Sequence, residues 1–143
     1  MENRHLYRGK RTDNGEWVEG AYYVEPYTER SFIIQWNSTG LGFNEFIEVD
    51  EKTICQCTGL KDRNGKLIWE NDIVKAFTSK GDEWCLAKIV FGEHSLNLGW
   101  CEEGIKSLEK YNQRLFNVGF GRNDANRCMV VGNIFDNPEL LEV

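Results

Sequence analysis

The sequence TGLKDRNGKLIWENDIV, residues 58–74, carries the strongest structural signals of the chain. Asn64-Gly65 is a tight-turn signal, because both residue types tolerate the positive φ that two-residue type I′ hairpins require. The polar residues 70–72 indicate a further turn, and an apolar strand at residues 73–77 follows it. Turns this closely spaced leave room only for short strands. The segment therefore predicts β-hairpins.

Similar turn chemistry lies near the N-terminus, in GKRTDNGEW at residues 9–17. Trp17 and Val18 are adjacent, and at a period of two they cannot share a face, so the sheet is either covered on both sides or bulged. Strands are expected at residues 4–11, 16–24, 31–36, 53–57, 83–91, 98–101 and 128–135, and a loop that leads into a strand is expected at residues 42–49. Residues 105–116 have spacing near that of a short helix, and Pro138 is placed to start one helical turn.

Length and composition favour a mainly β fold, β-rich α+β at most. The chain has 143 residues, with five Trp, five Tyr, eight Phe and 14 Gly but only two Pro. Aromatic residues favour strands, and Gly favours turns. A chain of this length fits a single compact domain, residues 1–143, with a possible division into β subregions 1–57 and 58–143.

Charge and hydropathy restrict location and partners. The net charge of −6 disfavours non-specific binding to nucleic acid, which needs Lys and Arg against phosphates. No apolar run approaches the ~20 residues of a membrane span, and the N-terminus lacks an apolar signal core. We therefore expect a cytoplasmic protein with no membrane partner, whose five Cys are thiols.

The central segment resembles the YopX family of phage and prophage proteins, whose pattern is thr-gly-leu-lys-asp, asn-gly-lys, an aromatic, an acid, gly-asp and ile-val. YRGKR at residues 7–11, NGEWVEG at residues 14–20 and VGNIFDNPELL at residues 131–141 fit the family as well. Two positions depart from it. Asn71 replaces the usual Gly, and Asn tolerates positive φ better than other non-Gly residues. Cys57 replaces an aromatic residue.

The resemblance implies a phage or prophage gene product that acts in the cytoplasm of a bacterial host cell. It implies a mainly β fold whose C-terminal half is an SH3-like small barrel. It implies no catalytic activity, because the family has no established one, and we expect no cofactor.

The residues themselves also disfavour an enzyme or a metal site. Cys55 and Cys57 are separated by one residue, whereas a structural zinc site uses a longer spacing and a second pair of ligands. The acids near the centre, among them Asp62, Glu70 and Asp72, lie in expected turns, where carboxylates cap backbone amides. Turn chemistry accounts for them without acid–base catalysis.

The expected function is therefore a non-enzymatic interaction module that binds a host or phage protein through strand edges and exposed aromatic residues. A homo-oligomer is possible. One alternative is a nucleic-acid-binding small β-barrel, and another is a ligand-sequestering protein that acts against host signalling. The residues predicted for an interaction surface are Tyr7, Arg8, Arg11, Trp17, Trp69 and Trp100.

Overall fold

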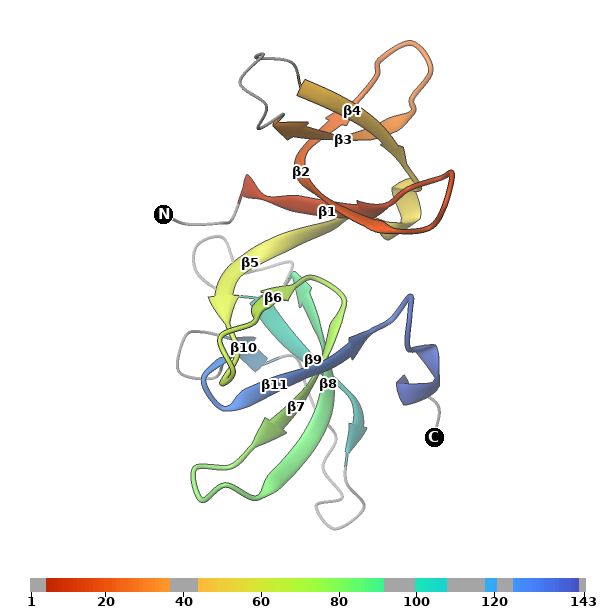
Figure 1. Ribbon diagram of the computed structural model, residues 1–143. Helices are drawn as coiled ribbons and strands as arrows, with labels where there is room; N and C mark the ends of the chain where they lie inside the picture. Colours follow the sequence, from red (N-terminus) through yellow and green to blue (C-terminus); the bar gives the residue numbers. More distant parts are fainter. Residues whose placement is uncertain (1–4, 37–43, 92–99, 108–117, 121–124, 142–143) are drawn as a thin grey trace. The chain divides into compact units, whose positions relative to one another are not determined.

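The computed structural model describes residues 5–36, 44–91, 100–107, 118–120 and 125–141 and confirms a mainly β chain (Figure 1). All strand pairing in it is antiparallel, and helical conformation among these residues is confined to 3-10 turns and to Ala125. Two 3-10 turns are η2 (Glu51–Thr53) and η4 (Pro138–Leu141), the latter at the predicted helical turn. The strands are β1 (Tyr7–Lys10), β2 (Trp17–Val24), β3 (Ser31–Trp36), β4 (Asn44–Val49), β5 (Cys55–Lys61), β6 (Leu67–Trp69), β7 (Asp72–Phe77), β8 (Glu83–Phe91), β9 (Trp100–Ser107), β10 (Val118–Phe120) and β11 (Cys128–Asn133).

The chain divides into two compact units, Met1–Cys57 and Thr58–Val143. The boundary falls inside β5, at the position where the sequence suggests two β subregions. We call the two parts the N-terminal unit and the C-terminal unit and describe each by itself. The single domain stays a prediction.

The first sheet has the strand order β4-β3-β2-β1-β5-β6, and the N-terminal unit contains β1 to β4 and the start of β5. The C-terminal end of β4 also forms backbone hydrogen bonds with the C-terminal end of β1. There Thr12 N donates to Glu48 O at 3.2 Å, Asp50 N donates to Lys10 O at 2.9 Å, and Arg11 forms a bridge with Val49. These contacts curl the sheet and give it an inner and an outer face.

The inner face holds the core of the N-terminal unit. Val18, Ile33, Ile47 and Val49 form a buried cluster against which Tyr7 also packs. Trp17 is the neighbour of Val18 on β2, and the alternation of a strand therefore sends it to the outer face. The adjacent pair thus reflects a sheet with large side chains on both faces.

Both Asn-Gly turns are longer than the expected type I′ turns. Gly15 and Gly65 have positive φ, 74° and 82°, but Asn14 and Asn64 do not. Gly65 N donates to Asp62 O at 3.0 Å and Asp62 N donates to Lys66 O at 2.8 Å, which is a type I turn followed by a left-handed glycine. At the other turn, Gly15 N donates to Arg11 O, which closes a wider loop.

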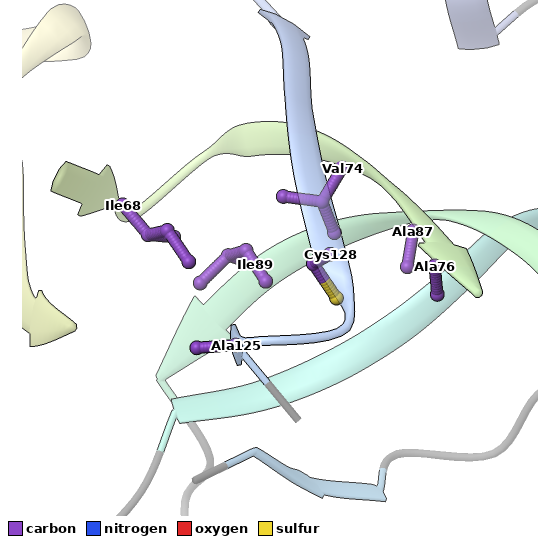
Figure 2. Close-up of a cluster of buried hydrophobic side chains, with 7 residues drawn as sticks. All are labelled: Ile68, Val74, Ala76, Ala87, Ile89, Ala125 and Cys128. Atoms are coloured by element: carbon purple, nitrogen blue, oxygen red, sulfur yellow. The ribbon is translucent and has the colours of Figure 1, made fainter. Parts of the chain in front are cut away.

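The C-terminal unit contains a second sheet in the order β10-β9-β8-β7-β11. Its core is a cluster of buried, mostly small apolar residues (Figure 2): Ile68, Val74, Ala76, Ala87, Ile89, Ala125 and Cys128. The helix expected from residue 105 is wrong for residues 105–107, because they continue β9. The remainder of that prediction, residues 108–116, lies outside the described residues.

The described strands form open sheets, and no closed barrel is found among them. The SH3-like barrel is therefore not confirmed. In the same part of the chain, no helix has the length and apolar character needed to span a membrane.

Candidate functional site

The carboxylate of Asp62 in the central motif is a structural anchor. It is buried, and its Oδ1 accepts hydrogen bonds from Asn64 N at 2.8 Å and Lys66 N at 2.9 Å. Its Oδ2 accepts from Val130 N of β11 at 2.9 Å. Three backbone amides therefore bind this carboxylate, which ties the hairpin loop to a distant strand.

The turn that follows β6 is held in a similar way. The buried Asp72 accepts a hydrogen bond from Trp69 N at 2.8 Å through Oδ2. Between them, Asn71 has a φ of 68°, as expected for a position where the family usually has Gly. The prediction that acids near the centre cap backbone amides is confirmed for Asp62 and Asp72.

The terminal motif also serves a turn. Asn133 Oδ1 accepts from Phe135 N at 3.0 Å and Asp136 N at 2.9 Å, and Asn137 Oδ1 accepts from Asn133 N at 3.2 Å. A Cβ at Gly132 would lie 2.4 Å from Asn137 Oδ1, so the turn requires glycine there. Polar residues of the central and terminal motifs therefore hold turns of the C-terminal unit.

The cysteines of the described residues are interior side chains. Cys55, Cys57 and Cys128 are buried, and Cys55 Sγ donates to Thr53 O at 3.2 Å. Within the ranges that the structure describes, no three His, Cys, Asp or Glu side chains gather in a way that could hold a metal ion. The side chains of Cys85 and Cys101 lie outside this description.

Of the residues predicted for an interaction surface, the structure brings Arg8 and Trp17 together. The guanidinium carbon of Arg8 lies 4.5 Å from the centre of the Trp17 ring, and Lys10 Nζ lies 5.3 Å from the same ring. Arg8 is only 9% exposed. Both cations are thus engaged with the indole, which leaves the indole less available for stacking a base.

Tyr7 and Arg11 make other contacts within the N-terminal unit, and Trp69 and Trp100 belong to the C-terminal unit. Tyr7 packs on the inner face, its ring centre 5.6 Å from that of Tyr22. Arg11 binds the carboxylate of Asp13 through two nitrogens, at 2.9 Å and 2.8 Å. Trp69 is 3% exposed in the C-terminal unit. Trp100 is in β9, and its side chain lies outside the described residues.

The sheet of the N-terminal unit carries a different group of aromatic side chains on its outer face. We call Tyr23, Phe32 and Phe46 the outer aromatic cluster. The ring centre of Tyr23 lies 6.4 Å from that of Phe32 and 6.0 Å from that of Phe46, the latter edge to face. Tyr23 is 39% exposed and Phe46 is 59% exposed. Three neighbouring strands, β2, β3 and β4, each contribute one ring.

An ion pair borders the cluster. Arg30 forms a salt bridge with Glu48, and its guanidinium carbon lies 5.5 Å from the centre of the Phe32 ring. In the loop between β2 and β3, Glu25 accepts hydrogen bonds from the amides of Tyr27 and Thr28. The hydrogen bond from the Thr28 hydroxyl lowers the pKa of the Glu25 carboxyl below its ordinary value, and the hydrogen bonds from the two amides lower it further by smaller amounts.

Sequence reasoning missed this cluster although a signal was present. Phe32 precedes Ile33, and Phe46 precedes Ile47. Two adjacent large apolar residues on a strand must face opposite sides, as they do at Trp17 and Val18. Once the isoleucines are assigned to the core, both phenylalanines are predicted on the outer face.

The described residues also form an open groove beside the loop of the first hairpin. It is lined by polar residues of that loop and of the turn that holds η2, among them Arg11, Asp13 and Asp50. A ligand-sequestering site needs an enclosed pocket with convergent polar groups. This groove is open to solvent and supplies a weaker basis for binding than the aromatic cluster.

Comparison with known proteins supports the fold and assigns the family. The comparison with curated proteins finds no match. The crystal structure of protein EF1440 from Enterococcus faecalis is similar to this chain with a TM-score of 0.50 and 24% identity, covering 95% of this chain and 96% of that one. This likeness concerns the fold alone. The model of the YopX protein family matches residues 6–142, and the chain therefore belongs to the YopX family.

Proposed function

We propose that this chain is a non-enzymatic interaction module of a phage or prophage, which binds a host or phage protein in the bacterial cytoplasm. The observation that carries the proposal is the outer aromatic cluster. Exposed aromatic rings in mutual contact are typical of the residues that dominate binding energy in protein interfaces. Tyr23 and Phe46 combine exposure with a fixed edge-to-face arrangement, so their ordering costs little upon binding.

The fold supports this proposal by what its motifs do. In the C-terminal unit the polar residues of the central and terminal motifs bind backbone amides, as at Asp62 and Asn133. The five strands β7 to β11, in which the last pairs with the first, support an SH3-like arrangement, which stays part of the proposal. Such a scaffold presents surfaces rather than reacting groups.

A nucleic acid is the less favoured partner. Arg8 and Lys10 are engaged with Trp17, and Arg11 binds Asp13. These cations are therefore directed at the protein itself, whereas non-specific binding to nucleic acid depends on cations that contact phosphate.

The test is an affinity capture with the tagged full chain from lysate of the bacterial host, with and without nuclease. The same capture is made with Tyr23→Ser combined with Phe46→Ser, and with Tyr27→Ser as the control. Tyr27 is 93% exposed and is not part of the cluster. We expect one stoichiometric protein that survives nuclease, is lost in the double variant and is kept in the control.

Two results would contradict the proposal. Equal capture by the double variant and the wild-type protein would remove the aromatic cluster from the interface. A capture that contains only nucleic acid, and disappears upon nuclease treatment, would establish the nucleic-acid alternative.

A further inference from the structure

The strand β4 has an open edge beside the outer aromatic cluster. It pairs with β3 along its whole length, Asn44–Val49. On its other side, Glu48 O accepts from Thr12 N and Asp50 N donates to Lys10 O. Because the backbone groups of a strand alternate in direction, those of Phe46 face the same side as those of Glu48. No described residue pairs with Phe46 on that side.

The side chains at this edge define what an added strand would contact. Phe46 lies on the outer face within the aromatic cluster, and Glu45 is exposed on the other face. Successive side chains of an added strand would point alternately to these two faces. The edge therefore favours a segment in which apolar residues, placed beside Phe46, alternate with basic residues, placed beside Glu45.

A second copy of the chain fits this edge poorly. The bond from Thr12 occupies the edge at Glu48, so a symmetric antiparallel pair of β4 strands has to pair Asn44 with Phe46. In that register Glu45 lies opposite Glu45 of the second copy, and like charges directly opposite are destabilising. The N-terminal unit also has ten acidic and six basic residues, a net charge of −4, which disfavours self-association and favours a basic partner.

We infer that β4 binds an extended segment of a different protein as an added strand, and that this segment alternates apolar and basic side chains. The inference rests on the proposed function and specifies the class of its partner. Backbone hydrogen bonds at Phe46 give affinity, the aromatic cluster receives an apolar side chain, and Glu45 selects a basic one. The same charge repels both a second copy and acidic strands.

The experiment begins with a library of random linear peptides roughly twelve residues long, long enough to span one strand. The library is displayed and selected on the full chain. We expect enriched peptides with alternating apolar and basic residues. An enriched set that lacks basic residues, or no enrichment at all, would overturn the inference.

The best enriched peptide is then labelled, and its affinity is measured by fluorescence anisotropy for paired variants. Glu45→Lys should weaken binding about fivefold, whereas the control Glu16→Lys, an equally exposed glutamate, should not. Phe46→Pro removes an amide at an edge position where proline is tolerated, and should bind about tenfold more weakly than Phe46→Ala. Circular dichroism checks the fold of each variant. If Phe46→Pro does not fold, the comparison of Glu45→Lys with Glu16→Lys tests the inference.

The outcomes separate this inference from the proposed function. If Phe46→Pro captures the lysate protein as well as Phe46→Ala does, and Glu45→Lys captures it as well as the wild type, while the double variant of Tyr23 and Phe46 loses it, the interaction module stands and strand addition is wrong. A dimer in sedimentation that Phe46→Pro abolishes would identify a second copy as the occupant and overturn the inference.

Discussion

The two Asn-Gly loops of this chain have similar sequences, but their aspartates act differently. In the N-terminal unit, Asp13 is exposed and binds the guanidinium of Arg11 within the same loop. In the C-terminal unit, Asp62 is buried and binds three backbone amides, one of them from a residue 68 positions away. The comparison teaches that similar turn chemistry can shape either a surface hairpin or an anchor of the sheet, and burial decides which.

The same contrast extends to other turns of the two units. Glu25 is only partly buried and closes its loop by local contacts with Tyr27 and Thr28. Asp72 and Asn133 are buried and hold the turns that begin or end the strands β7 and β11. We therefore expect polar turn residues to affect stability strongly in the C-terminal unit and weakly in the N-terminal unit.

The largest expected effect is that of Asp62→Ala. The variant leaves three amides without their charged acceptor in a largely buried site, and we expect unfolding to cost about 3 kcal/mol less. Urea unfolding followed by circular dichroism measures the loss. Hydrogen exchange should show faster exchange at the amides of Lys66 and Val130. A loss below about 1 kcal/mol, the ordinary worth of one neutral hydrogen bond, would contradict the anchor role of Asp62.

A smaller effect is expected at Asn71, whose backbone is left-handed. Asn71→Ala should destabilise the protein by about 1 kcal/mol, because Cβ is disfavoured at positive φ without the local hydrogen bonding that Asn offers. Asn71→Gly should leave stability nearly unchanged, because the entropy of glycine and its relief of strain offset one another. Urea midpoints of the two variants, measured side by side, test the prediction. Equal losses in both would attribute the effect to the amide side chain.

The sequence predicts much of the fold because its strongest signals are local. Short runs rich in apolar residues predict strands such as residues 31–36 and 83–91, which are found with those bounds. The predicted type I′ turn was wrong. A type I turn followed by a left-handed Gly65 favours the same residue types, so the sequence does not distinguish the two turns. The strand β10, residues 118–120, is too short to give a periodic signal.

The candidate site was harder to predict because exposure depends on partners distant in sequence. Trp69 and Trp17 give similar signals, but Trp69 is interior while Trp17 lies on the outer face under two cations. The outer aromatic cluster unites residues from three strands, and its register follows from pairings such as Tyr23 with Phe32. The amino-acid pattern shows that Phe32 and Ile33 face opposite sides of the sheet. Only the fold shows which aromatic rings are in contact.

A pH-dependent effect is expected in the N-terminal unit at Glu25. The hydrogen bond from the Thr28 side chain lowers the pKa of this carboxyl from its ordinary value of 4.5. A lowered pKa means that the ionised form stabilises the loop above pH 4.5 and that this support is lost as pH falls through the lowered pKa. NMR should show the amides of Tyr27 and Thr28 losing their hydrogen-bonded shifts on acidification. In Glu25→Gln these shifts should be independent of pH over the same range.

The smallest expected effect is that of Asp13→Ala, the counterpart of Asp62→Ala. The Arg11 side chain, through its hydrogen bond, lowers the pKa of the Asp13 carboxyl, so the pair is ionised at neutral pH. Because both groups are open to solvent, water and salt replace each partner when the other is removed. We expect no resolvable change in the urea midpoint, at low or at high salt. A loss comparable to that of Asp62→Ala would mean that this hairpin loop is also an anchor, and that burial of the carboxylate does not separate the two loops.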